Sequence, residues 1–270
     1  MADGLSFDRF VAVDWSGARG SRHRGVAVAV AAPGDGAPVL VAQPDRRGWA
    51  RGEVADWLEA LPGRVLVGFD FSFAPPFVER GAYLPGLDAP ETGPAFWAFV
   101  DGHCGADPDY GAHGFMEGVA RAHFWMGAGD GEKRDFLHFR VCEARFNAGG
   151  GGKPSTVFDC VGAAQVARAS FSGMRVLNRL RGGYAVWPFD APSKRTVVEI
   201  YTRAMLRLAG GRGLKVRDAA GLEAALGAFG SEAPAGVFND HETDVLVSAA
   251  ALRRMAGEPG WWRCEAMTAA

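Results

Sequence analysis

Four acidic residues stand in places where a carboxylate is costly. Asp14 ends the apolar run FVAVD, and Asp70 ends a second apolar run, VLVGFD. Glu199 interrupts the apolar segment VVEIY, and Asp244 lies in DVLVSAAAL, whose other residues are typical of a protein core. A buried carboxylate is unfavourable unless hydrogen bonds, a cationic partner or a metal ion stabilise its charge. The pattern therefore predicts an acidic functional site.

Carboxylate oxygens are ligands that hard divalent cations accept, and such a cation relieves the repulsion between clustered carboxylates. We therefore expect Asp14, Asp70, Asp244 and Glu199 to hold one or two Mg²⁺ or Mn²⁺ ions, and a pair of such ions suits phosphodiester hydrolysis. Each acid also has a structural interpretation. Asp14 and Asp70 could bond the backbone of the turns that follow them, and Glu199 could face solvent on an edge strand.

Four further residues could support these acids or contact a substrate. Asp240 is expected mainly as a helix-start residue, and His241 follows it directly. Ser16 lies in the turn after the first apolar run, and Lys153 lies in GGGGKPS, whose spacing differs from that of a phosphate-binding loop. Asp244, four residues after Asp240, shares its helix face and lies too deep in the helix to cap it.

Strands and helices alternate along the chain in the order that would position these residues. The segment from Ala74 to Ser193 is rich in glycine, proline and aromatic residues, and we interpret it as a long, partly helical insertion (74–193) within a single α/β domain (1–270). If the strands that carry Asp14 and Asp70 are neighbours, their carboxylates meet at the carboxyl edge of the sheet. The expected strands are 10–15, 25–32, 39–43, 64–71 and 195–201, and the expected helices are 53–61, 161–180 and 240–255, the last with a capping box at Asn239 and Glu242.

The composition is typical of a globular protein, with 48% hydrophobic and 22% charged residues in 270. A net charge of −2 argues against a protein that coats nucleic acid by charge alone. Neither a signal-peptide pattern nor a membrane-spanning apolar run is visible, so we expect a cytoplasmic protein with no membrane partner. The four cysteines, which are too far apart in sequence for a zinc knuckle or a disulfide framework, are Cys104, Cys142, Cys160 and Cys264.

The order strand, strand, strand, helix, strand, with aspartates ending the first and fourth strands, resembles the ribonuclease-H-like fold, a mixed five-stranded sheet flanked by helices. DHETDVLVSAAAL resembles the acidic final-helix motif of RuvC-type Holliday-junction resolvases. From about residue 10 to 255, several stretches resemble the bacterial family called domain of unknown function 429, whose members are predicted ribonuclease-H-like nucleases. These stretches are VAVDWSGA, VGFDFSF, the S-x-x-G-M-x-x-L-x-x-L stretch from Ser170, AVWPFD, VVEIYTRA and DHETDVLVSAAALR.

This resemblance implies a metal-dependent nuclease or phosphodiesterase that acts on nucleic acid or a nucleotide. By it, Asp14, Asp70 and Asp244 match the acids of the first strand, the fourth strand and the final helix. Glu199 matches the glutamate of the family's E-[VI]-Y motif, and it would have to replace the first-helix glutamate of ribonuclease H itself.

Two other functions stay open. The chain could be a non-catalytic ribonuclease-H-like module that keeps the acids for a structural metal or binds a small ligand under the insertion. It could also be an actin-like or sugar-kinase-like nucleotide enzyme, since DWSGARGSR resembles a glycine-rich phosphate turn.

Overall fold

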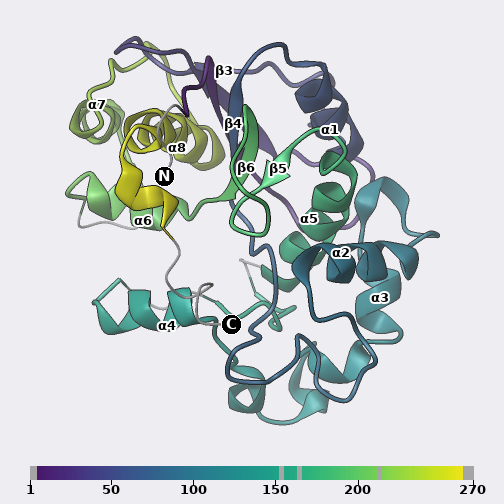
Figure 1. The fold of residues 1–270 in the computed structure, drawn as a ribbon. Helices are drawn as coiled ribbons and strands as arrows, with labels where there is room; N and C mark the ends of the chain where they lie inside the picture. The colour runs from purple at the N-terminus through teal and green to yellow at the C-terminus, as the bar shows by residue number, and fades with distance from the viewer. Residues whose placement is uncertain (1–4, 152–154, 163–165, 212–214, 264–270) are drawn as a thin grey trace.

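The computed structural model describes residues 5–151, 155–162, 166–211 and 215–263, and a mixed sheet lies at its centre (Figure 1). The sheet has six strands in the order β3-β2-β1-β4-β6-β5, one more than the sequence predicts. The additional strand, β5, has two residues, too few to show any alternation of apolar and polar side chains. The strands are β1 (Arg9–Asp14), β2 (Ala27–Ala31), β3 (Val39–Leu40), β4 (Val65–Phe69), β5 (Ala185–Val186) and β6 (Arg195–Glu199).

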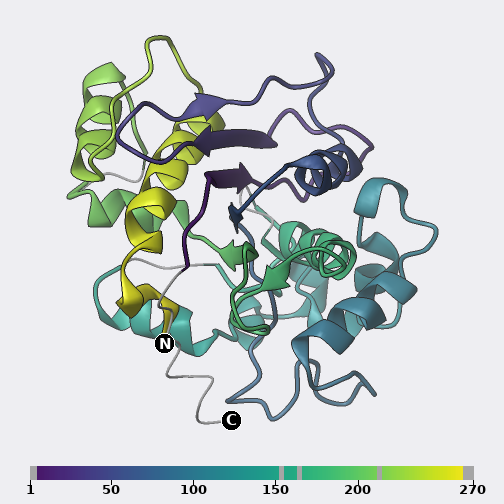
Figure 2. The ribbon, with the colours of Figure 1, turned by 45° about the horizontal axis from the view of Figure 1, so that its top comes forward.

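Helices cover both faces of this sheet, with α8 on one side and α1 and α5 on the other (Figure 2). The helix expected at 53–61 begins two residues earlier, and the final helix begins at the expected residue. The α-helices are α1 (Arg51–Ala60), α2 (Gly93–Gly102), α3 (His113–Glu117), α4 (Val141–Ala148), α5 (Val166–Leu180), α6 (Thr202–Leu208), α7 (Ala219–Ala228) and α8 (Asp240–Ala256).

The first and fourth strands are neighbours, as the sequence predicts. β1 runs parallel to β4 and antiparallel to β2, and β4 runs parallel to β6. The central residues of β1, Val11 to Val13, have no exposed surface, which agrees with their continuous apolar sequence. Because the first and fourth strands are parallel, their carboxyl ends lie at the same edge of the sheet.

Alternation along the strands divides the core into two apolar clusters. Val13 and Phe69 belong to the cluster on the face of α1 and α5, whereas Ala12 and Leu66 belong to the cluster on the face of α8. Gly68 allows α8 and β6 to come close, because a Cβ atom there would lie 2.8 Å from a methyl carbon of α8 and 2.6 Å from one that follows β6.

A capping box starts α8, as the sequence predicts. The Asn239 side chain accepts a hydrogen bond from the backbone nitrogen of Glu242 at 3.1 Å, and the Glu242 carboxylate accepts one from the backbone nitrogen of Asn239 at 2.8 Å. Two otherwise unpaired donors at the helix start are thereby satisfied.

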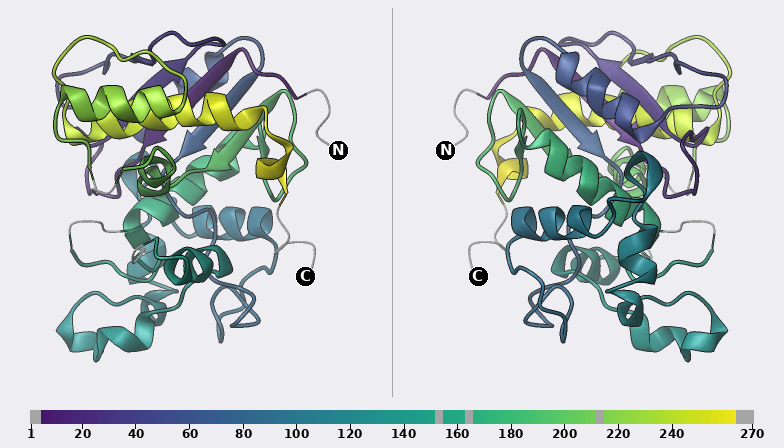
Figure 3. Two further views of the ribbon diagram at one scale, coloured as in Figure 1. Left: turned by 90° about the vertical axis from the view of Figure 1, so that its left-hand side faces the viewer. Right: turned by 90° about the vertical axis from the view of Figure 1, so that its right-hand side faces the viewer.

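The segment 74–193 is only partly an insertion. Its helix α5 packs into the core on the face of α1, and β5 pairs with β6 at the edge of the sheet. The helices α2, α3 and α4 lie beyond one end of the sheet (Figure 3). The sequence shows an amphipathic helix at α5, but this pattern does not say which layer the helix joins.

The described cysteines are free thiols: Cys104 and Cys160 are buried and Cys142 is exposed, while Cys264 lies outside the described residues. Burial raises the pKa of Cys104 to about 11 and that of Cys160 to about 12. Over the described ranges, no helix is long and apolar enough to cross a membrane.

Candidate functional site

The carboxyl ends of β1 and β4 bring two of the aspartates side by side. Val13 pairs with Phe69, so Asp14 and Asp70 occupy the next positions on neighbouring strands. The backbone nitrogen of Asp70 donates to the carbonyl oxygen of Val13 at 3.1 Å, which extends the pairing to this level. Because side chains alternate along a strand, both aspartates point to the face covered by α8.

The first turn of α8 contacts the end of β1. Nδ1 of His241 lies 2.6 Å from Oδ2 of Asp14, and the His241 side chain is about half exposed, at 48%. Asp244 follows three residues later and therefore lies on the same face of the helix.

The third turn of α8 reaches Asp70 through two hydroxyl groups. Oγ of Ser248 lies 3.3 Å from Oγ1 of Thr202, which donates to Oδ2 of Asp70 at 3.3 Å. Along α8, Asp244 lies between His241, which contacts Asp14, and Ser248, which reaches Asp70 through Thr202. The fold thus brings Asp14, Asp70 and Asp244 together at one edge of the sheet.

The grouping changes the acidity of Asp70. Its pKa is raised well above the usual range, first because burial disfavours the charged form and then because Asp14 and Asp244 add negative charge. The hydrogen bond from Thr202 acts in the opposite direction.

Asp244 also holds its proton more tightly than an ordinary aspartate. Burial raises the pKa of Asp244 to about 6, Lys215 offsets part of this rise, and the charges of Asp14 and Asp240 add to it. Nζ of Lys215 lies 3.0 Å from Oδ2 of Asp240 and 3.7 Å from Oδ2 of Asp244. Two cationic partners, Lys215 and His241, therefore compensate part of the negative charge of this site.

Glu199 does not join the three aspartates. It pairs in register with Phe69, so its side chain points to the opposite face of the sheet. There Arg140 donates to both carboxylate oxygens, at 2.7 and 2.6 Å, and the backbone nitrogen of Phe73 donates at 2.9 Å. The charge of Glu199 still contributes to the raised pKa of Asp70, as the weakest of the causes.

The other candidate residues have different surroundings. Asp240 is the first residue of α8, which agrees with its expected place at the start of the helix. It also forms the ion pair with Lys215. Oγ of Ser16 accepts from the backbone nitrogen of Ala18 at 3.3 Å, which stabilises the turn after β1. Lys153 lies outside the described residues.

A buried arginine holds the loop that follows Asp14. The Arg51 side chain is 1% exposed and donates to the carbonyl oxygens of Ser16 and Ala18 at 2.7 to 3.0 Å. The Asp109 carboxylate, from the segment 74–193, accepts from the backbone nitrogen of Arg51 at 2.9 Å. A Cβ atom at Gly17 would lie 2.3 Å from a backbone nitrogen of α5, so the loop also packs tightly there.

Sequence reasoning missed three residues of this region. Thr202 directly follows the EIY segment after β6, so the motif itself marks its position. Arg140 precedes Glu143 by three residues, a spacing that marks the start of α4 but not the contact with Glu199. The sequence around Lys215 contains no signal that it meets α8.

No group of three or more histidine, cysteine, aspartate or glutamate side chains is arranged to hold a metal ion within the described part of the chain. The chemistry of the three aspartates nevertheless fits Mg²⁺ or Mn²⁺, because all three supply oxygen donors. Burial first, and then the neighbouring carboxylates, raise the pKa values of Asp70 and Asp244, and a bound cation would stabilise their charged forms.

Comparison with family models, curated proteins and solved structures finds no match to this chain. Its function is therefore inferred from the site itself.

The contact between His241 and Asp14 can be measured directly. The hydrogen bond that His241 donates to Asp14 raises the pKa of His241 above 6.5, whereas burial lowers the pKa values of His113, His123 and His138. This contact therefore stabilises the fold below pH 6.5, and its contribution is lost as the pH rises through the raised pKa. In an NMR titration of the metal-free protein, we expect His241 to lose its proton at higher pH than those three histidines.

The variant Asp14→Asn should return the pKa of His241 to near the ordinary value, and Asp240→Asn should lower it much less, because the hydrogen bond to Asp14 is the largest cause of the shift. A His241 pKa that Asp14→Asn does not lower would show that this contact does not form in solution.

Proposed function

We propose that this chain is a metal-dependent phosphodiesterase or nuclease with a ribonuclease-H-like fold, acting on nucleic acid or a nucleotide. Asp14, Asp70 and Asp244 would hold one or two Mg²⁺ or Mn²⁺ ions. The observation that carries the proposal is the convergence of these three aspartates from β1, β4 and α8, two of them with raised pKa values.

The order of the strands supports the fold part of the proposal. Three strands pair antiparallel in the order β3-β2-β1, and β4 then pairs parallel to β1 on its other side. An acidic helix at the end of the chain packs across β1 and contributes the third carboxylate. The order of these elements underlies the resemblance to the ribonuclease-H-like fold.

Each side chain of the site has its own role in the proposed binding of a cation. The raised pKa values of Asp70 and Asp244 mean that protons compete with a cation for these two carboxylates. Thr202 keeps Asp70 oriented, and His241 does the same for Asp14. A bound divalent cation would supply Lewis-acid stabilisation of the phosphate and a more acidic water. Glu199 is outside the proposed ligand set because Arg140 holds it on the other face.

We expect any hydrolysis of nucleic acid or of bis-(p-nitrophenyl) phosphate to require Mg²⁺ or Mn²⁺. Chelation should reduce the rate by at least about 100-fold, since the cation would stabilise the charge that develops in the transition state. The rate should also fall as the pH drops through about 6, where Asp244 gains its proton. Rates with EDTA, with Mg²⁺ and with Mn²⁺ at pH 5.5 and pH 8 test this.

The control is Asp240→Asn, which keeps a helix-capping side chain and should retain most of the activity. Robust cleavage by homogeneous protein in excess chelator would contradict the mechanism.

A second candidate is a non-catalytic binding module. The contacts of His241 with Asp14 and of Lys215 with Asp244 favour it, because they balance part of the acidic charge without a metal. Calorimetry with Mn²⁺ separates the two functions: a single tight site in a protein without hydrolytic activity supports the module, whereas metal-dependent cleavage supports the enzyme.

A further inference from the structure

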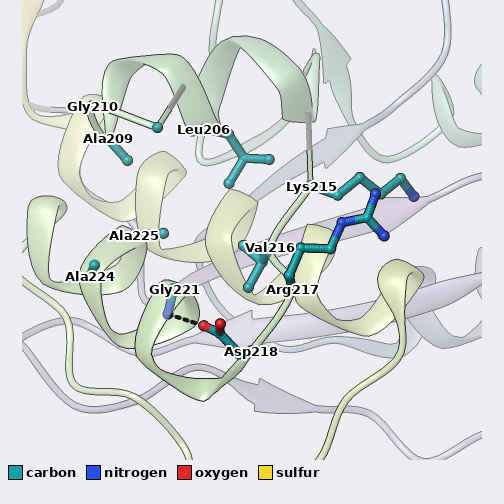
Figure 4. A pocket seen from close by; sticks show the side chains of 11 residues that line it. Leu206, Ala209, Gly210, Lys215, Val216, Arg217, Asp218, Gly221, Ala224 and Ala225 are labelled. Carbon is teal, nitrogen blue, oxygen red and sulfur yellow. Dashed lines mark hydrogen bonds between the residues drawn. The ribbon is translucent and has the colours of Figure 1, made fainter. Parts of the chain in front are cut away.

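A cavity of about 340 Å³ opens between α6, α7 and the segment 215–218 (Figure 4), and one of its lining residues, Lys215, forms an ion pair with Asp244. A volume of this size falls in the lower range of small-molecule sites in proteins. Its walls include Leu206 from α6, Ala209 directly after that helix, Lys215 to Asp218 from the segment before α7, and Gly221, Ala224 and Ala225 from α7.

The walls of this cavity divide into an apolar floor and a cationic rim. Leu206, Val216 and Ala225 supply apolar surface, and Figure 4 shows them around the cavity. Among the described lining residues, Asp218 carries the acidic side chain. Its carboxylate accepts a hydrogen bond from the backbone nitrogen of Gly221 at 2.8 Å, and this bond caps the start of α7. The floor therefore offers apolar contact and no free charged group.

The rim connects the cavity to the acidic site. Lys215 lines the cavity and also forms ion pairs with Asp240 and Asp244. Arg217 lines the cavity two residues further on, and its charge lowers the pKa of Asp240. In Figure 4 the side chains of Lys215 and Arg217 extend to the same side, away from Ala224. An anionic group bound at Lys215 would lie near Asp244, because this lysine pairs with that aspartate.

We propose that this cavity seats the base of a nucleotide whose phosphate binds Lys215 and Arg217. The inference rests on the proposed function and deepens it, because it places the organic part of the substrate beside the residues that would cleave the phosphate ester. A nucleobase has the flat, weakly polar faces that an apolar floor accepts, and the phosphate matches the charge of the rim. Since the floor carries no side-chain donors or acceptors, all bases should bind with similar affinity.

A substitution in one wall of the cavity, which reduces its volume, tests the proposal. Ala224 and Ala228 are both exposed positions on α7, one helical turn apart, and Ala224 alone lines the cavity. Ala224→Leu places a larger side chain at the cavity, and Ala228→Leu makes the same change outside it. Calorimetry in EDTA measures the binding of adenosine monophosphate, cytidine monophosphate and ribose 5-phosphate to the wild type and to both variants.

We expect both nucleotides to bind the wild type at least about tenfold more tightly than ribose 5-phosphate, because the sugar phosphate lacks the base. Ala224→Leu should remove this preference, and Ala228→Leu should keep it. Equal affinity for all three compounds, or a preference that Ala224→Leu leaves intact, would overturn the proposal.

A parallel titration with Mn²⁺ keeps this test separate from the proposed function. Nucleotide binding in EDTA that responds to Ala224→Leu supports the cavity even if Mn²⁺ does not bind. If Mn²⁺ binds but nucleotides bind no more tightly than ribose 5-phosphate, the metal site is supported and the cavity is rejected as a base-binding site.

Discussion

Asp244→Asn is expected to stabilise the metal-free protein at neutral pH and to abolish its stabilisation by Mg²⁺. The pKa of Asp244 is about 6 in the folded protein against an ordinary value of 3.8, so ionising it in the folded state costs free energy. The difference corresponds to about 1–3 kcal/mol. Asparagine has nearly the same shape and no charge, so it removes this cost.

The pH dependence has a definite sign. Between pH 3.8 and pH 6 the folded protein binds more protons at this position than the unfolded chain does, so this group lowers the stability as the pH rises. The advantage of Asp244→Asn over the wild type should therefore be small at pH 4 and reach its full size above pH 6. Thermal or urea unfolding at a series of pH values, in EDTA, measures this difference.

The same substitution removes one charged ligand from the proposed metal site. Added Mg²⁺ should raise the melting temperature of the wild type, because a ligand that binds only the folded state stabilises it. It should not raise that of Asp244→Asn, and hydrolytic activity should be lost as well. The matched control, Asp240→Asn, changes an exposed aspartate on the same helix and should keep both responses to Mg²⁺.

An Asp244→Asn protein that melts well below the wild type in EDTA would contradict this interpretation. Asp244 would then be a structural hydrogen-bonding residue, and the central member of the proposed ligand set would be wrong.

Arg140→Met is expected to destabilise the protein by about 3 kcal/mol, since it leaves one buried carboxylate, Glu143, and one partly buried carboxylate, Glu199, without their cation. The side chain of Arg140 is 16% exposed, and it bonds Glu143 of α4 as well as Glu199 of β6. These bonds connect the segment 74–193 to the sheet. Urea unfolding of the variant and the wild type gives the difference in free energy.

A second substitution shows which charge causes the loss. Adding Glu199→Gln to Arg140→Met should restore part of the stability, because the uncompensated charge at the end of β6 disappears. Arg134→Met is the matched control, since this arginine is 78% exposed in the same segment and should cost less than about 0.5 kcal/mol. If Arg140→Met and Arg134→Met lost equal free energy of unfolding, Arg140 would not connect the segment 74–193 to the sheet.

Short-range patterns in the sequence were sufficient to predict the frame of the site. The apolar runs that end at Asp14 and Asp70 predicted β1 and β4, and continuous burial on both faces makes such runs distinctive. The residues Asn239 and Glu242 predicted the start of α8, because a capping box depends on a spacing of three residues along the chain. The prediction that β1 and β4 are neighbours is confirmed.

The face on which Glu199 lies was decided only by the tertiary structure. VVEIY is apolar on both sides of the glutamate, so the segment carries no alternation from which its face could be inferred. The contact with Arg140 spans 59 residues. No local pattern records a pairing of that kind, and the same holds for Lys215 and Asp244.

The layer joined by α5 was likewise decided in three dimensions. Its apolar face is visible in the sequence, but an amphipathic helix packs equally well on an insertion or on a sheet. The sequence by itself therefore determined which acids end the central strands and where the last helix begins. The long-range packing of α8, of α4 and of the segment 215–218 decided which charges those acids meet, because such contacts depend on where distant segments fold.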